Sequence, residues 1–172
     1  MDAEPGGVLY YEPFICGVRA MIRRLQKTDI DTVAQIWLTA NREAHDFVPV
    51  KYWEDNFTPV KGMFLQAEVY VCEEEKNNEI RGFIGLEDEY IAGVFVRKEA
   101  RSKGTGKALL DYVKEIKREL TLHVYVKNER AVRFYQREGF QILKKMTDDA
   151  TGEEEYLMGW KRNYTPMKYV RG

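Results

Sequence analysis

Hydrophobic residues alternate with polar ones in some segments of the chain and recur every three or four residues in others. Alternation with a period of two is typical of strands, and a period of 3.6 is typical of amphipathic helices. The strand pattern covers residues 21–25, 68–73, 81–87, 90–97, 121–126 and a closing pair around the turn at 148–152. The helical pattern covers residues 28–43, 51–57, 104–118 and 129–138. These segments predict a domain that mixes helices and strands, in which the strands at 68–73, 81–87 and 90–97 are antiparallel neighbours.

The first helix has a clear apolar face. This face is formed by Ile30, Val33, Ala34, Trp37 and Leu38. Thr28 with Asp31 has the spacing of a capping box, so we expect the helix to begin there and to end near Glu43. The next helical stretch is short, and Pro59 is expected to start a separate helical turn after it.

The length of 172 residues fits one domain. Residues 1–20 contain Gly and Pro and show neither period, so we interpret them as an N-terminal extension. The domain then covers residues 21–162, and residues 163–172 form an irregular C-terminal tail. No apolar run reaches the roughly 20 residues of a membrane span, and no signal-peptide pattern is present, so a cytoplasmic location is expected.

The overall charge and the cysteines exclude several kinds of partner. The 27 basic and 28 acidic side chains give a net charge of -1, which does not favour binding to nucleic acid or to an anionic membrane. Cys16 and Cys72 are far apart and lack the spacing of a zinc or redox motif, so no metal site is expected. The function must therefore come from local motifs.

A segment rich in glycine and basic residues, Arg101–Lys107, lies between a predicted strand and a predicted helix. Glycines in such a loop allow several backbone N–H groups to converge on phosphate oxygens, and the helix dipole adds partial positive charge. A nucleotide P-loop is disfavoured, because Arg101 replaces its first glycine and Ala108 replaces its hydroxyl residue. A dinucleotide fingerprint would require glycine at Leu109. The loop therefore indicates a phosphate ligand other than ATP or NAD.

Two motifs resemble those of the GCN5-related N-acetyltransferase (GNAT) superfamily. The loop RSKGTG at 101–106 is similar to the family's R-x-x-G-x-G, which holds the CoA pyrophosphate. The run at 128–140 is similar to the family's N-x-x-A-x-x-F-Y-x-x-x-G-F and follows the loop at the usual interval. The chain also resembles small, poorly characterised bacterial members that carry H-D-F after the first helix, as at 45–47.

The resemblance implies a fold and a cofactor. The fold is α/β (α+β), with a mixed, mostly antiparallel sheet of six or seven strands, helices on both faces and a splayed parallel strand pair around the cofactor. The acyl donor is acetyl-CoA, and no metal is expected. The implied cofactor-binding residues are Val94, Phe95, Val96, Arg101, Ser102, Lys103, Gly104, Thr105, Gly106, Lys107, Asn128 and Tyr135.

Tyr135 has two interpretations. From the residues alone it is a core aromatic, because it shares a helical face with Ala131 and Phe134. The resemblance instead implies that its hydroxyl protonates the leaving thiolate as a general acid. The base that receives the amine proton is left open among Glu89 with its neighbours Glu87 and Asp88, His123, and His45 with Asp46.

The acceptor side carries fewer signals. By resemblance, His45, Asp46 and Phe47 line the substrate pocket. We expect a small-molecule or peptide amine as the acceptor and a monomer or homodimer as the assembly. The expected function is transfer of an acetyl group from acetyl-CoA to a primary amine in a ternary complex. The alternative is a non-catalytic CoA-binding sensor or scaffold.

Overall fold

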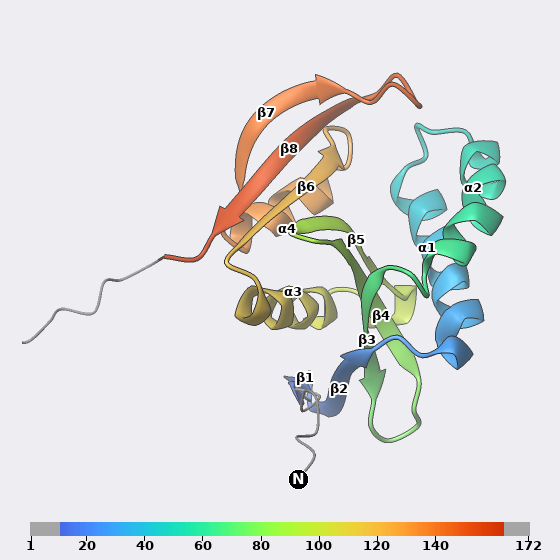
Figure 1. Ribbon diagram of the computed structural model, residues 1–172, viewed down its shortest axis with the longest axis vertical. Coiled ribbons are helices and arrows are strands. Elements are labelled where there is room, and N and C mark those ends of the chain that lie inside the picture. Colours follow the sequence, from blue (N-terminus) through green and yellow to red (C-terminus); the bar gives the residue numbers. More distant parts are fainter. Residues whose placement is uncertain (1–10, 164–172) are drawn as a thin grey trace, which may run out of the picture.

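The computed structural model describes residues 11–163, which form one mixed sheet with helices on both faces (Figure 1). The strands are β1 (Phe14–Ile15), β2 (Val18–Arg24), β3 (Glu68–Glu74), β4 (Ile80–Glu87), β5 (Tyr90–Val96), β6 (Glu119–Tyr125), β7 (Gln141–Thr147) and β8 (Glu154–Lys161). The helices are α1 (Ile30–Ala44), α2 (Val50–Met63), α3 (Thr105–Ile116) and α4 (Glu129–Arg137). None of these helices is long and apolar enough to cross a membrane.

The sheet order is β1-β2-β3-β4-β5-β6-β8-β7. Neighbouring strands are antiparallel except for β5 and β6, which are parallel. The expected mixed, mostly antiparallel sheet is therefore confirmed. It has eight strands in the described part of the chain rather than six or seven, because the two-residue β1 adds an outer strand that the sequence pattern does not reveal.

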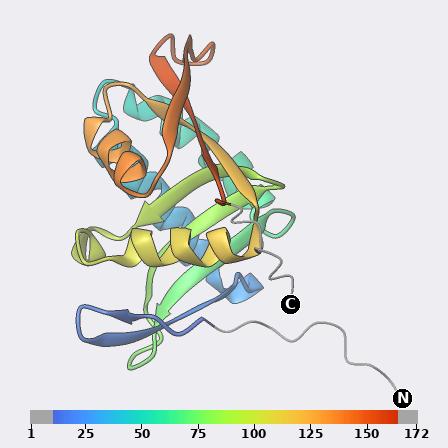
Figure 2. The ribbon, with the colours of Figure 1, turned by 90° about the vertical axis from the view of Figure 1, so that its left-hand side faces the viewer.

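Helices cover the two faces of the sheet, and alternation along β3 explains why (Figure 2). Val69 and Val71 pack in the cluster that includes α1 and α2, whereas Tyr70 and Cys72 pack in the cluster that includes α3 and α4. Successive residues of a strand point to opposite faces of the sheet. A strand that is apolar at every position therefore needs helices packed on both faces. The helices on both faces are thus confirmed.

Strands β5 and β6 separate after a short paired stretch. Their pairing joins Tyr90 to Thr121 and Ile91 to Leu122. On its other side, β5 has a bulge against β4, because Ala92 lies between two paired residues and has no partner of its own. A bulge bends the strand that carries it and increases its twist. The splayed parallel pair expected from the resemblance is present here.

The start of the first helix differs from the prediction. The carboxylate of Asp29 accepts a hydrogen bond from the backbone N–H of Gln26 at 2.7 Å, so the capping box joins these two residues. Asp29 also forms an ion pair with Arg23 at 2.7 Å. The predicted box of Thr28 and Asp31 was wrong, because a short 3-10 turn precedes α1 and the ion pair fixes the carboxylate there.

The second helix also differs from the prediction. Helix α2 runs without a break from Val50 to Met63, with Pro59 inside it. The predicted short helix at 51–57 with a restart at Pro59 was therefore wrong. Trp53 and Phe64 are buried at the two ends of this helix, and their packing outweighs the backbone hydrogen bond that proline lacks.

Part of the predicted N-terminal extension belongs to the sheet. Tyr11 bridges to Ile22, and Ile15 is buried in the core with 4% exposure. Residues 1–10 lie outside the described part of the chain, as do residues 164–172 of the predicted tail. Residues 11–20 therefore pack as a hairpin against the predicted domain.

Candidate active site

A cleft of about 1190 Å³ lies where β5 and β6 separate. Residues of α1, α2, α4, β8 and the loop before α3 also line it. Most of the predicted site residues meet in this cleft: His45, Val94, Phe95, Val96, Arg101, Ser102, Gly104, Thr105, Gly106, Lys107, His123, Asn128 and Tyr135.

Four predicted site residues are not among the residues that line the cleft. Glu89 is exposed at the turn between β4 and β5, and its backbone carbonyl accepts from Thr121. The Lys103 carbonyl accepts from the Cys16 thiol at 3.1 Å. Asp46 and Phe47 follow α1, and the Phe47 ring packs behind His45 with their ring centroids 5.6 Å apart.

The loop before α3 presents unpaired backbone donors. Ser102 and Gly104 have left-handed backbone conformations, with φ of 59° and 89°. Within the described part of the chain, the N–H groups of residues 102–107 donate to no backbone carbonyl, and the first such bond of the helix runs from Ala108 to Gly104. Converging free N–H groups at a helix N-terminus form an anion site. The loop can therefore bind a diphosphate.

Gly106 lies close to α4, which packs on this loop. A Cβ atom at this position would lie 3.3 Å from Cζ of Phe134. Phe134 belongs to the helix that also carries Tyr135. The glycine therefore allows the two motifs of the sequence to approach each other closely.

The Arg101 side chain braces the loop. Its Nε donates to the Val96 carbonyl at 3.2 Å, and its Nη1 donates to the Glu43 carboxylate at 2.6 Å. These contacts join the loop to β5 and to α1. The guanidinium thus binds protein groups in this structure. The backbone N–H groups of the loop remain the main hydrogen-bond donors for an anion.

Further cations line the cleft near the loop, and they are not among the residues predicted from the sequence. Arg130 donates to the Ser102 hydroxyl at 2.6 Å, and Arg133 and Arg137 follow it on α4. Their spacing of three and four residues places them on one face of the helix, which is a signal that the sequence does contain. Together with Lys107 they make this end of the cleft basic.

The cleft edge of β5 offers backbone groups to a ligand. Arg97 donates its N–H to the Arg81 carbonyl on β4 at 2.8 Å. Backbone groups alternate in direction along a strand, so the N–H groups of Val94 and Val96 point to the opposite side, toward the cleft. The Phe95 side chain packs on the face of the sheet that α1 and α2 cover and stacks on Phe83, with ring centroids 5.0 Å apart. An extended ligand can therefore pair with β5 as an additional strand.

Helix α4 places two predicted residues at the cleft. Asn128 accepts from the Ala131 N–H at 3.3 Å as the helix cap, and its Nδ2 lies 3.2 Å from Nε2 of His45. Tyr135 is buried, with 7% exposure, and its hydroxyl has no hydrogen-bond partner among the described residues. Burial raises the pKa of Tyr135 above its ordinary value, with a smaller contribution from Tyr90. The phenol thus keeps its proton at neutral pH.

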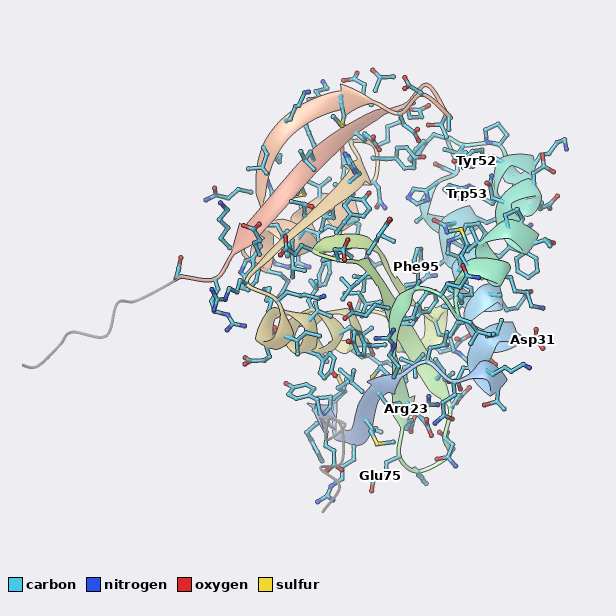
Figure 3. The ribbon with its side chains drawn as sticks, in the orientation of Figure 1. Arg23, Asp31, Tyr52, Trp53, Glu75 and Phe95 are labelled. Carbon is cyan, nitrogen blue, oxygen red and sulfur yellow. The ribbon has the colours of Figure 1, made fainter. Side chains whose placement is uncertain are left out.

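His45 lies in an aromatic pocket. Its ring stacks on Trp53, with centroids 5.2 Å apart, and meets the edge of Tyr125 at 5.1 Å. Burial lowers the pKa of His45 to about 4, although the Asn41 carbonyl opposes this shift. The imidazole is therefore neutral at neutral pH. Figure 3 shows Trp53 near the beginning of α2, on the side facing the cleft.

At the end of the cleft away from the phosphate loop, His123 and Tyr90 form a hydrogen-bonded pair. The Tyr90 hydroxyl lies 2.8 Å from Nδ1 of His123. Glu155 of β8 and Tyr52 of α2 also line the cleft. The turn between β7 and β8 lies beside the segment that joins α1 and α2 (Figure 1). This end of the cleft is therefore aromatic and acidic.

The arrangement fits an acyl-CoA donor. The unpaired amides of the loop fit a diphosphate, the edge of β5 fits the extended pantetheine arm, and Tyr135 lines the cleft where the two strands separate. No group of three or more His, Cys, Asp or Glu in the described residues is able to hold a metal ion. The fold and the cleft together define a CoA-dependent acyltransferase.

Comparisons with known proteins identify the family. The Acetyltransferase (GNAT) domain model matches residues 66–142. The peptidyl-lysine N-acetyltransferase YiaC of Escherichia coli (strain K12) is 34% identical over 142 residues, which are 81% of this chain and 96% of YiaC. The peptidyl-lysine N-acetyltransferase YjaB of the same organism is 26% identical over 137 residues, which are 80% of this chain and 92% of YjaB.

Solved structures agree with the fold. The solution structure of apo-form YjaB from Escherichia coli superposes with a TM-score of 0.73 at 24% identity and covers 81% of this chain and 96% of that one. The structure of yncA from Salmonella typhimurium with acetyl-CoA has a TM-score of 0.63 at 16% identity. The match covers 86% of this chain and 96% of that chain. This chain belongs to the GCN5-related N-acetyltransferase (GNAT) superfamily, and it is an acetyl-CoA-dependent N-acetyltransferase.

Proposed function

We propose that the protein acetylates lysine side chains of proteins or peptides by direct transfer in a ternary complex, with Tyr135 as the general acid. The acceptor class is supported by YiaC and YjaB, both of which are named peptidyl-lysine N-acetyltransferases. The observation that carries the catalytic role is the position of Tyr135, which lines the cleft where β5 and β6 separate.

Direct transfer is favoured by the residues around the cleft. No cysteine is among the described residues that line it, and the Ser102 hydroxyl is already bonded to Arg130. A covalent acyl-enzyme would need an activated nucleophile with a base beside it. The acceptor amine is therefore proposed to attack the thioester itself.

In the proposed reaction the acceptor nitrogen loses two protons in all, and the leaving thiolate gains one. The acceptor ammonium first gives one proton to His123, whose Nε2 has no hydrogen-bond partner among the described residues and passes the proton to solvent. The neutral amine attacks the carbonyl carbon, whose oxygen is polarised by a backbone N–H of Val94 or Val96. As the C–S bond breaks, the thiolate takes the Tyr135 proton. The new amide nitrogen loses its second proton, which restores the phenol.

The Tyr135→Phe variant tests this proposal. We expect its kcat to fall by roughly 10²–10⁴-fold, because a positioned general acid contributes about that much. Acetyl-CoA affinity should be unchanged, since the ring and its packing on Phe140 remain. The measurements are thiol release with a panel of lysine peptides, and calorimetry for the cofactor.

Controls in the same assay define the acceptor. The panel includes peptides whose only amine is the N-terminus, and polyamines as small-molecule acceptors. Mass spectrometry of the products identifies the acetylated nitrogen. Normal turnover in Tyr135→Phe would remove the acid role from this residue. Thiol release with another amine of the panel but not with the lysine peptides would contradict the proposed acceptor class.

A further inference from the structure

The cleft has opposite charges at its two ends. Lys107, Arg130 and Arg137 lie near the phosphate loop, whereas Glu155 lies at the far end, beside His123. A basic end suits the phosphates of the donor. The acidic end is unexplained by the donor, because nothing in the proposed transfer so far uses a carboxylate there.

Glu155 differs from the other acidic residues that line the cleft. Glu43 is paired with Arg101 at 2.6 Å, Glu138 with Lys107 at 3.3 Å, and Glu129 with Arg133 at 3.8 Å. Among the described residues, Glu155 has no basic partner within ion-pair distance and its carboxylate makes no hydrogen bond. A half-buried carboxylate without a cation is costly, so a ligand that supplies one gains free energy there.

The surroundings of Glu155 are those of a site for an ammonium group. Tyr52 of α2, Tyr90 of β5 and His123 of β6 line the same cleft as Glu155. Glu155 pairs with Tyr125 of β6, so its side chain lies on the same face of the sheet as that of His123. The Tyr125 hydroxyl also holds Asp148 of the β7–β8 turn at 2.7 Å. Burial raises the pKa of Glu155, with Asp148 and Asp149 adding to this rise and His123 opposing it. Aromatic ring faces attract cations, and they add to the attraction of a carboxylate.

The neighbouring Asp148 is not free for this role. Its carboxylate accepts from the Tyr125 hydroxyl at 2.7 Å, from the Thr151 hydroxyl at 3.0 Å and from the Ala150 N–H at 3.0 Å. These bonds hold the β7–β8 turn together. Asp148 therefore contributes negative potential, and Glu155 has the carboxylate that is able to contact a ligand.

We propose that Glu155 determines acceptor specificity by binding the ammonium of the incoming lysine among Tyr52, Tyr90 and His123. This inference rests on the proposed lysine acetylation and adds the residue that selects a cationic acceptor. Glu155 holds the ammonium at the entrance to the transfer step, and His123, positioned by Tyr90 at 2.8 Å, receives the proton. The neutral amine that remains has lost its attraction to Glu155 and advances to the thioester.

The test compares a charged with an uncharged amine in the Glu155→Gln variant. For a lysine peptide, we expect the acceptor KM to rise about 10- to 100-fold, the range of a lost charged hydrogen bond. The acetyl-CoA KM should be unchanged. Trifluoroethylamine, which is neutral at neutral pH, should react with the variant as it does with the wild type. The matched control is Glu154→Gln on the same strand, where Glu154 is exposed and paired with Lys145.

Each result supports or overturns the inference. An unchanged KM for the lysine peptide overturns it, and so does an equal loss with both amines. Calorimetric acetyl-CoA affinity shows whether Glu155→Gln is folded, and Glu155→Asp, which keeps the charge, should retain much of the preference for the lysine peptide. If the Glu155 inference fails, lysine acetylation still stands when the wild type acetylates the lysine peptides and Tyr135→Phe lowers that turnover, so the two proposals fail separately.

Discussion

At the residue scale, His45 links the stability of the apo protein to pH. Burial lowers the pKa of His45 from its ordinary value of 6.5 to about 4. Between these pH values His45 is protonated in the unfolded chain and neutral in the folded chain. The free energy of unfolding therefore falls as the pH falls from 6.5 to about 4. Below this window both states are protonated and the contribution is constant. The expected loss is at most about 3 kcal/mol.

Urea unfolding at several pH values across this window measures the effect. Carboxyl groups also titrate there, so the comparison is with His45→Gln, which removes one imidazole and leaves the carboxyl groups in place. The wild type should lose more stability than the variant as the pH is lowered. If the free energy of unfolding depends on pH equally in the two proteins, His45 has the same pKa in the folded and the unfolded state.

Residue types alone predicted part of the site and missed another part. Gly104, Asn128 and Tyr135 stand in spaced motifs, and each lines the cleft. Glu155 is one acidic residue in a run of acidic residues at 153–155, and the sequence does not show which of them faces the cleft. Its role depends on pairing with β6 opposite Tyr125, which is a property of the folded sheet.

At the element scale, the β1–β2 hairpin supports the phosphate loop. Ile15 is 4% exposed, and its Cγ2 lies 3.8 Å from the position that a Cβ of Gly104 would take. We expect Ile15→Ala to lower the free energy of unfolding by about 2–5 kcal/mol, because it leaves a cavity in the core. Acetyl-CoA affinity should fall as well, since the loop loses the surface on which it rests.

Denaturant unfolding and calorimetry measure these two effects. Phe14→Ala is the matched control, because Phe14 is adjacent on the same strand but 70% exposed. Its effect on stability should stay within about 0.5 kcal/mol. An Ile15→Ala variant with full stability would show that the hairpin is dispensable for the domain.

Elements with a strong period were predicted well, and elements that depend on tertiary contacts were not. Helix α3 and strand β4 lie within a few residues of their predicted bounds. Helix α2 continues through Pro59 because tertiary packing at both ends holds it. The bulge at Ala92 has no hydrophobic period of its own, so the sequence pattern does not predict it.

At the scale of the whole molecule, the sequence describes the donor half of the cleft better than the acceptor half. The two motifs of the donor half lie in continuous segments, the loop before α3 and the helix α4 with its cap. The acceptor half is assembled from α1, α2, β5, β6 and β8, which are far apart in the chain. Residues that lie so far apart in the chain do not form a motif with a fixed spacing. The acceptor site therefore becomes visible only when the fold brings these elements together.

The distribution of charge over the molecule predicts a salt effect on donor binding. The net charge is only -1, yet the donor end of the cleft gathers Lys107, Arg130, Arg133 and Arg137. Acetyl-CoA carries several negative charges, and the Debye length shrinks from about 10 Å at 0.1 M salt to about 3 Å at 1 M. We expect acetyl-CoA affinity to fall steadily with added salt when it is measured by calorimetry. Replacing the three arginines with Gln should weaken binding at low salt and flatten this dependence.

A matched variant separates local from overall charge. Replacing Lys51, Lys144 and Lys145 with Gln removes the same three positive charges from positions outside the cleft. If proximity to the phosphates matters, this control keeps the affinity and the salt slope of the wild type, because its charges lie in bulk water. If both triple variants weaken acetyl-CoA binding equally, the overall charge of the protein attracts the donor. The arginines of α4 then contribute no more to binding than the lysines outside the cleft. The structure favours the first result, because Arg130 already contacts the phosphate loop through Ser102.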